Sequence, residues 1–291
     1  MKRVLIFLLI VVTFVLGTYM LINTTPEAHS LDFTREDANR IYEAREASPE
    51  GLAPAFKTYE MYIQLANEEK NPLIKAENFI SQTCVLYFIG DNSLKTAEKI
   101  KYHLLGKEAA TNAISILERS PGVALEEQYS EPLARAYFWF AVHLVKWGEA
   151  NGIVSSLIQL STVDKYLNYI INMGEEQVYD YAVFRLLGRI AYMLPFPLRN
   201  LKKSLDYLEK ANANSLCDER DISRNSTNVL FYADTLLALG GHENKEKAIW
   251  LLKRLIKKGE SLETLKMYNP EIVPEAKKDI NIAKNTLREN Q

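Results

Sequence analysis

The amino-acid sequence predicts an all-α protein, a tetratricopeptide-like array of helical hairpins (an α-α superhelix) behind one N-terminal transmembrane helix. Three observations predict this fold class. The 291 residues include only 12 glycines and 10 prolines, which is few for the tight turns of β-barrels and sandwiches. Apolar residues recur at helical spacing along most of the chain, without sustained alternation. The chain also opens with an uncharged run long enough to cross a bilayer.

Residues 1–22 are interpreted as a membrane anchor. The uncharged run from Val4 to Ile22 would span roughly 28 Å as a helix, close to the hydrocarbon thickness of a bilayer. Lys2 and Arg3 precede it, which predicts a cytoplasmic N-terminus and a domain facing the periplasm. A cleaved signal peptide is the alternative, but the run is longer than a usual signal core, which favours an uncleaved anchor in the inner membrane. Residues 23–32 are expected to form a polar linker.

The helical repeat domain is predicted to cover residues 33–260, because a triplet of residues recurs there. Its members are spaced by four and then three positions, share one helix face and begin with a small residue that lets a neighbouring helix approach closely. The four triplets are Ala55, Tyr59 and Tyr62; Ala109, Ala113 and Ile116; Ser204, Leu208 and Ala211; and Ala248, Leu252 and Leu255. Segments around Gly188 and Ala233 precede the last two triplets as partner helices. The intervals are irregular, so a further repeat is expected within residues 131–175.

Three segments depart from this pattern. Residues 133–147 are apolar on nearly every side and are expected to form a helix at the centre of the domain. Residues 245–258 form a basic amphipathic stretch, which suits either the second helix of the last hairpin or a helix lying on an anionic membrane. Residues 261–291 are more polar and are expected to form a capping helix or a tail.

The chain resembles the TRAP-transporter T-component family, a group of tetratricopeptide-like exported bacterial proteins. The resemblance is carried by Ala134–Trp139, Lys146–Gly148, Arg185–Arg189, Leu194–Pro197, Lys203–Leu208 and Tyr232–Leu236. It implies an α-helical array that acts beside a tripartite transport system, by contacting an extracytoplasmic solute-binding protein or by housing a small ligand. Family members are typically lipoproteins, whose lipid is carried by a cysteine directly after the apolar run. This chain has no cysteine at that place, so its tether is expected to be a membrane helix.

Seven residues are candidates for a ligand-binding site inside the array. They are Tyr137, Trp139, His143, Trp147, Arg185, Arg189 and Tyr192. The aromatic members suit the wall of an apolar pocket, and the two arginines, one helical turn apart, suit an anionic ligand. A structural role is the alternative for each: the rings and the histidine as core side chains, the arginines as partners of Glu175, Glu176 or Asp180.

Other functional classes find little support. Lys and Arg number 35 against 37 for Asp and Glu, a net charge of -2, so no nucleic-acid partner is predicted. The common nucleotide-binding, hydrolase and metalloprotease motifs are absent and the 4 histidines lie apart, so no catalytic residue, cofactor or metal is predicted. His103 and His242 are expected to face solvent. Cys84 and Cys217 are expected to be separate thiols, with a disulfide as the alternative outside the cytoplasm.

Together with the resemblance, the sequence predicts a non-enzymatic scaffold or binding protein, anchored in the inner membrane and facing the periplasm. It would serve a TRAP-type transport system, with a solute-binding protein as its partner and a small apolar or anionic ligand in its interior. Two alternatives stay open: a general tetratricopeptide assembly factor for other envelope proteins, and an enzyme whose residues converge from separate helices. The identity of the ligand and a homo-oligomeric state are left open.

Overall fold

The computed structural model describes residues 31–46, 50–119, 127–216, 221–261 and 273–290. The chain divides into two units, Met1–Thr34 and Arg35–Gln291, and the helices described all belong to the second. They are α2 (Arg35–Glu43), the 3-10 helix η1 (Glu50–Leu52), α3 (Ala53–Glu68), α4 (Pro72–Asn92), α5 (Thr96–Arg119), α6 (Glu127–Asn151), α7 (Ile153–Asn172), α8 (Val178–Met193), α9 (Leu201–Asn214), α10 (Ser226–Leu239), α11 (His242–Lys258) and α13 (Val273–Asn290).

The predicted all-α class is confirmed. The described ranges contain no strand, only an isolated bridge between Leu216 and Ser223. Within the same ranges, no helix combines the length and the apolar character needed to cross a bilayer. The anchor predicted at residues 4–22 lies outside the described residues, as does the linker up to residue 30.

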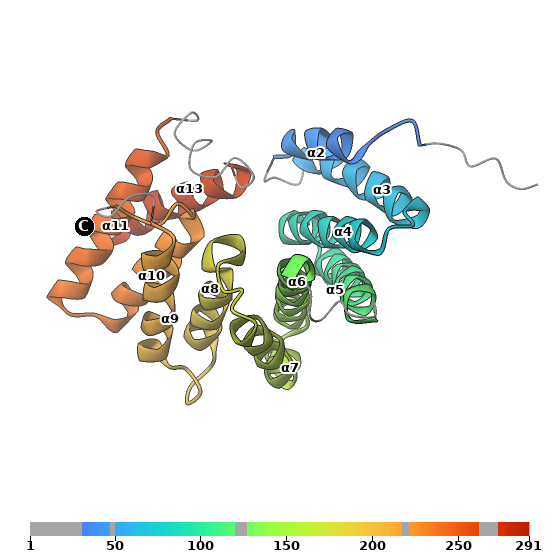
Figure 1. Ribbon diagram of the computed structural model, residues 1–291. Helices are drawn as coiled ribbons and strands as arrows, with labels where there is room; N and C mark the ends of the chain where they lie inside the picture. Colours follow the sequence, from blue (N-terminus) through green and yellow to red (C-terminus); the bar gives the residue numbers. More distant parts are fainter. Residues whose placement is uncertain (1–30, 47–49, 120–126, 217–220, 262–272, 291) are drawn as a thin grey trace, which may run out of the picture. The chain divides into compact units, whose positions relative to one another are not determined.

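Consecutive helices of the second unit pack against one another along the chain (Figure 1). Taken two at a time in chain order, they are α2 and α3, α4 and α5, α6 and α7, α8 and α9, and α10 and α11, but α3 also packs on α4 and α5 on α6. Each of the four predicted triplets lies on the second helix of such a pair, on α3, α5, α9 and α11. Helices α6 and α7 occupy residues 131–175, the interval in which a further repeat was expected.

The triplets are the buried stripes of these helices. The small residues that open them, Ala55, Ala109, Ser204 and Ala248, are all buried. Of the positions that follow, Ala113, Leu208 and Leu252 are fully buried, whereas Tyr59 is partly exposed. A small buried side chain lets two helices approach closely, so these positions explain where neighbouring helices meet.

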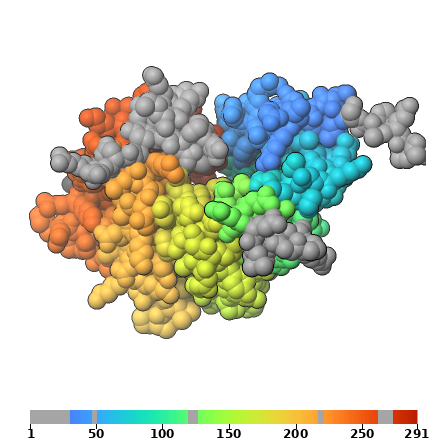
Figure 2. Space-filling model, viewed as in Figure 1, coloured from blue at the N-terminus to red at the C-terminus, as the bar shows by residue number. Residues whose placement is uncertain are grey.

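The buried residues form two hydrophobic clusters. One joins α4 to α8 and includes most of the apolar residues of α6, the helix predicted to lie at the centre. Helix α6 contacts α4, α5, α7 and α8, as a central helix should. The second cluster joins α9, α10, α11 and α13. In the space-filling view, side chains fill the gaps between the ribbons of consecutive helices, from α7 and α8 in yellow-green to α10 in orange (Figure 2).

Asparagine side chains determine where several helices begin. The Asn71 carboxamide accepts hydrogen bonds from the backbone N–H of Leu73 and Ile74, and Pro72 follows it as the first helical residue of α4. Asn200 and Asn225 cap α9 and α10 in the same way. These caps satisfy N–H groups that have no partner inside a helix, so they specify the short connections between pairs.

The basic stretch at residues 245–258 is the second helix of the last pair. The apolar residues of α11 that are buried, Ala248, Leu251, Leu252 and Leu255, pack in the cluster that α11 shares with α10 and α13. Three of its cations pair with acidic groups: Lys247 with Glu209, and Arg254 and Lys258 with Asp221. Trp250 is exposed over 47% of its surface.

The polar C-terminal region contains a helix, α13, that packs on α10 and α11 and also reaches the first helices of this unit. Arg45, just beyond α2, donates hydrogen bonds to both carboxylate oxygens of Glu275 at 3.2 Å. Lys278 Nζ lies 2.8 Å from Asp91 Oδ2 on α4. Two ion pairs thus join α13 to residues that precede it by most of the length of the chain.

We expect Gly188→Ala to destabilise the fold. A Cβ atom at this position of α8 would lie 2.6 Å from Leu208 Cγ and 3.2 Å from the Ser204 carbonyl oxygen of α9. Overpacking of this kind costs about 1–3 kcal/mol, which outweighs the roughly 1 kcal/mol that alanine gains over glycine in a helix. Chemical denaturation of both proteins measures the difference in unfolding free energy.

The control for this prediction is Leu208→Ala. Removing the Leu208 side chain makes room for the added methyl group, so Gly188→Ala should cost less in the Leu208→Ala background than in the wild type. An equal or larger cost in that background would show that the contact between α8 and α9 is not the cause.

Candidate functional site

A cavity of about 1790 Å³ lies among the helices of the second unit. Its walls come from α2, α3, α4, α6, α7, α8, α10 and α13, so segments from both ends of the unit line the same space. The volume exceeds the roughly 300–1,000 Å³ of ordinary small-molecule pockets. It is the candidate functional site of this protein.

Three of the seven predicted site residues line this cavity: Trp139, Arg185 and Arg189. The other four lie elsewhere. Tyr137 donates a hydrogen bond to Glu118 at 2.6 Å and packs against the rings of Tyr166 and Tyr169.

Three more of the predicted site residues do not line the cavity: Tyr192, His143 and Trp147. The guanidinium groups of Arg189 and Arg199 lie 4.9 and 4.6 Å from the centroid of the Tyr192 ring. Trp147 is partly exposed near the end of α6. His143 is fully buried in α6 and belongs to a pair of histidines.

The buried histidine pair joins α5 to α6. His143 Nε2–H donates to the Thr83 carbonyl oxygen at 3.0 Å, so its Nδ1 atom is the acceptor for His103 Nδ1–H at 3.2 Å. The prediction that His103 faces solvent is therefore wrong, since only 2% of its surface is exposed. Two glycines make room for the rings: a side chain at Gly90 would meet His103, and one at Gly106 would meet His143. His242 is exposed, as predicted.

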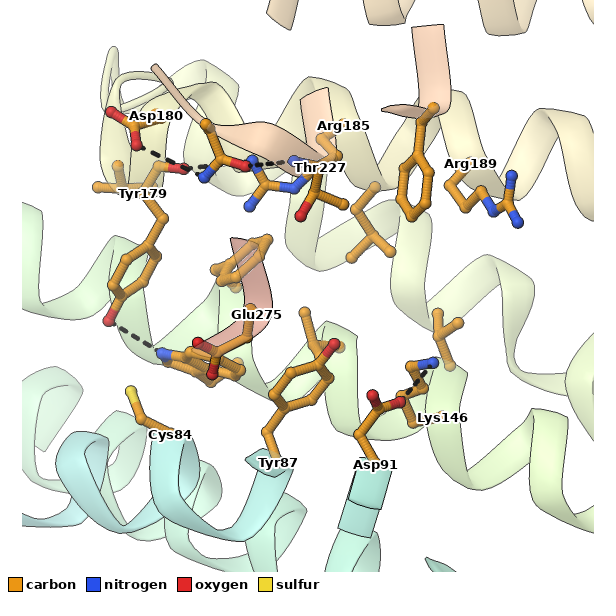
Figure 3. A pocket seen from close by; sticks show the side chains of 18 of the residues that line it. Cys84, Tyr87, Asp91, Lys146, Tyr179, Asp180, Arg185, Arg189, Thr227 and Glu275 are labelled. Carbon is orange, nitrogen blue, oxygen red and sulfur yellow. Dashed lines mark hydrogen bonds and ion pairs between the residues drawn. The ribbon is translucent and has the colours of Figure 1, made fainter. Parts of the chain in front are cut away.

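Aromatic rings form one wall of the cavity. Trp139 packs against Tyr87 and Tyr179, with ring centroids 5.4 and 5.6 Å apart. The Trp139 indole N–H donates to the Tyr179 hydroxyl at 2.9 Å (Figure 3). Burial raises the pKa of both tyrosines, so both hydroxyls stay protonated near neutral pH. Tyr87 and Tyr179 were not among the predicted site residues.

Tyr179 reaches the cavity from a strained turn at the start of α8. Tyr179, Asp180 and Tyr181 have φ angles of 52°, 60° and 59°, in the left-handed region that side chains other than glycine rarely adopt. Such residues cost on the order of 1–3 kcal/mol each and cluster at functional sites. Asp180 stabilises the turn by accepting hydrogen bonds from Arg224 and Asn225 on the α10 side.

The two arginines of α8 reach α10 rather than the acids that the sequence suggested. Arg185 donates to Asn228 Oδ1 at 2.7 Å and to the Tyr179 carbonyl oxygen at 3.4 Å. Arg189 pairs with Asp234 at 3.3 Å and lies over the Phe231 ring. Pairing with Glu175, Glu176 or Asp180 is not seen for either arginine in the described residues.

The cavity contains both signs of charge. Seven cations that line it form ion pairs with carboxylates: Arg35, Arg45, Arg135, Lys146, Arg189, Arg224 and Lys278. Arg185 also lines the cavity, but within the described residues it has no carboxylate at ion-pair distance. Burial lowers the pKa of Arg185, although a guanidinium remains charged at neutral pH.

Three acidic groups of the cavity form ion pairs or hydrogen bonds with neighbouring side chains, and their pKa values are shifted. Burial opposes ionisation of Asp91, but Lys146 and Lys278 hold the pKa of this carboxyl well below its usual range. Burial raises the pKa of Asp279, whose Oδ2 atom accepts hydrogen bonds from the hydroxyls of Ser226 and Thr227. Burial likewise raises the pKa of Glu275, the partner of Arg45.

The described residues contain no group of three or more His, Cys, Asp or Glu side chains arranged to hold a metal ion. Cys84 lines the cavity, whereas Cys217 lies outside the described residues, so the disulfide alternative stays untested.

No protein-family model matches the chain, and no curated protein matches it.

We expect the histidine pair to make the fold sensitive to acid. Burial lowers the pKa of His103 to about 4 and that of His143 to about 3. Unfolded histidines take up a proton near pH 6.5, so between pH 6.5 and 4 the unfolded chain binds more protons and acidification favours unfolding. Each histidine contributes a slope of up to about 1.4 kcal/mol of unfolding free energy per pH unit in this range.

The comparison of His103→Gln with wild type isolates this contribution, because the carboxyl groups titrate in both proteins. Denaturation at several pH values should give a shallower loss of stability on acidification for His103→Gln. His242→Gln is the control, since the side chain of His242 is 87% exposed, and it should keep the wild-type slope. Equal slopes for all three proteins would contradict the prediction.

Proposed function

We propose that this chain is a non-catalytic binding protein whose tetratricopeptide-like array holds a small ligand in its central cavity. The observation that carries this proposal is the cavity itself, with its volume of about 1790 Å³ and its wall of aromatic rings around Trp139. Aromatic walls with a few directed polar groups are typical of small-molecule sites. The strained turn that delivers Tyr179 to this wall supports a role for the cavity beyond packing.

Binding is favoured over catalysis because acidic groups of the cavity already form ion pairs or hydrogen bonds with other side chains. Asp91 lies between Lys146 and Lys278, and Asp279 accepts hydrogen bonds from two hydroxyls. A general acid or base must be able to exchange a proton with a substrate, and engaged groups of this kind are poorly suited to do so.

A ligand is also favoured over an extended peptide segment, the occupant that a general assembly factor would need. Helix α13 brings Glu275 and Lys278 to the wall, where they pair with Arg45 and Asp91. Those contacts join the two ends of the array at the cavity, whereas a peptide-binding array needs an open groove along its length.

We further propose that the protein is anchored in the inner membrane through residues 4–22, faces the periplasm and works beside a TRAP-type transport system. The uncharged N-terminal run supports the anchor, and the resemblance to the T-component family supports the transport role. Two segments that carry the resemblance, Ala134–Trp139 and Arg185–Arg189, belong to α6 and α8 and contribute Trp139, Arg185 and Arg189 to the cavity. The expected protein partner is an extracytoplasmic solute-binding protein.

Tryptophan fluorescence tests whether a ligand enters the cavity. A small-molecule extract of the source cells should change the emission of the full-length protein, because Trp139 lies on the cavity wall. Trp139→Phe should lose most of this change, while Trp250→Phe, which alters an exposed residue of α11, should keep it. Mass spectrometry should recover the bound molecule chemically unchanged. A response that survives Trp139→Phe would contradict binding at this site.

Affinity capture tests the transport role. The full-length chain, solubilised from its membrane, should recover an extracytoplasmic solute-binding protein from an envelope extract. Recovery of only unrelated envelope proteins would count against the transport role and would favour a general assembly factor. This experiment does not depend on the identity of the ligand.

A further inference from the structure

Arg185 differs from every other cation of the cavity wall in the groups that surround it. Both of its hydrogen bonds leave from Nη1, to Asn228 Oδ1 and to the Tyr179 carbonyl oxygen, and both acceptors are neutral. Nη2 and Nε have no hydrogen-bond partner among the described residues, and the side chain lines the cavity. The guanidinium therefore presents unused donors to the interior of the cavity.

The position of this guanidinium is determined by its neighbours. The Asn228 amide nitrogen donates to the Asp180 and Ala211 carbonyl oxygens and to Ser215 Oγ, at 3.0, 3.2 and 2.9 Å. These bonds orient the amide so that its oxygen faces Arg185. Arg185 is thus held in place by a connected polar network, and among the described residues no carboxylate lies within ion-pair distance of it. Asp180 and Asp279 act on this guanidinium only from beyond ion-pair distance, so a ligand carboxylate in direct contact would add charge-assisted hydrogen bonds that the protein does not supply.

A second unused donor faces the same space. The Tyr87 hydroxyl has no hydrogen-bond partner among the described residues, and it is directed from α4 toward the wall that carries Arg185 and Thr227 (Figure 3). The Tyr87 ring itself is positioned by Trp139 and His143, with centroids 5.4 and 6.5 Å away. The two donors belong to opposite walls, and the space between them is bordered by aromatic rings.

The charges nearby limit what the site accepts. Burial lowers the pKa of Arg185, and the negative charges of Asp180 and Asp279 oppose this effect. Glu275 lines the same cavity. A group with two negative charges, such as a phosphate monoester, would be repelled by these carboxylates, whereas one negative charge is matched by one guanidinium. The aromatic wall favours an apolar body attached to that charge.

We propose that Arg185 and Tyr87 bind the carboxylate of an organic monoanion, with Trp139 and Tyr179 packed against its apolar body. This inference rests on the proposed ligand-binding function and names the chemical class of the ligand. The Arg185 guanidinium donates from Nη2 and Nε to the carboxylate, and the Tyr87 hydroxyl donates from the opposite wall.

The test uses three probes that share one body and differ in the head group: 4-phenylbutyrate, 4-phenylbutanol and 4-phenylbutylammonium. Titration calorimetry on the full-length chain should give at least about tenfold tighter binding for the carboxylate than for the alcohol, and the weakest binding for the ammonium. Arg185→Gln should remove the preference for the carboxylate, Arg185→Lys should keep part of it, and Tyr87→Phe should reduce it several-fold.

Arg199→Gln is the control, because Arg199 is not among the residues that line the cavity and its guanidinium lies over the Tyr192 ring instead. It should leave the preference for the carboxylate within about twofold of wild type. Circular dichroism melting checks that each variant is folded, and Tyr87→Phe keeps the ring that packs on Trp139, so it tests the site even if Arg185→Gln unfolds.

Two results would overturn the inference. One is equal binding of the carboxylate and the alcohol by the wild type, which would leave the cavity as a site for neutral ligands and the proposed function intact. The other is a preference for the carboxylate that Arg185→Gln retains. Failure of all three probes to bind also counts against the carboxylate site, and the fluorescence response of Trp139 then decides separately whether the cavity binds any ligand.

Discussion

A single pair of helices leaves one apolar face exposed, and in this chain the next pair along the sequence covers it. Close approach between pairs requires small side chains where helices cross, and Ala55, Ala109, Ser204 and Ala248 provide them. Because each pair depends on its neighbours, the second unit has two extended hydrophobic clusters instead of one compact core. Part of the first cluster, including Phe138 and Val142, also lines the cavity together with polar groups.

The buried faces of α3, α5, α9 and α11 could be predicted from sequence because the pattern is local: each triplet reports which face of one helix is buried. Trp139, Arg185 and Arg189, three of the seven predicted site residues, line the cavity, and whether they bind a ligand stays a prediction. The partners of the two arginines could not be predicted from sequence. Asn228 and Asp234 lie on α10, and nothing in the spacing of residues along α8 indicates which later helix will pack beside it.

His103 and Tyr87 show two further limits of local reasoning. Lysines at positions 99, 101 and 107 precede and follow His103 within four residues, which suggests an exposed position, but the absence of a side chain at Gly90 leaves space for the His103 ring in the interior. Tyr87 stands in an apolar stretch of α4 and looks like an ordinary core residue. Only the arrangement of helices reveals that its hydroxyl faces a cavity, because that cavity is made by segments far apart in the sequence.

The contact between Arg45 and Glu275 joins residues separated by 230 positions. A growing chain can stack its early helix pairs as they leave the ribosome, since each pair needs only its neighbour. The cavity is different, because its wall is incomplete until α13 has been synthesised and has reached α2 and α4. A nascent chain halted before residue 273 would therefore have most of the helices but would lack the part of the cavity wall that α13 contributes.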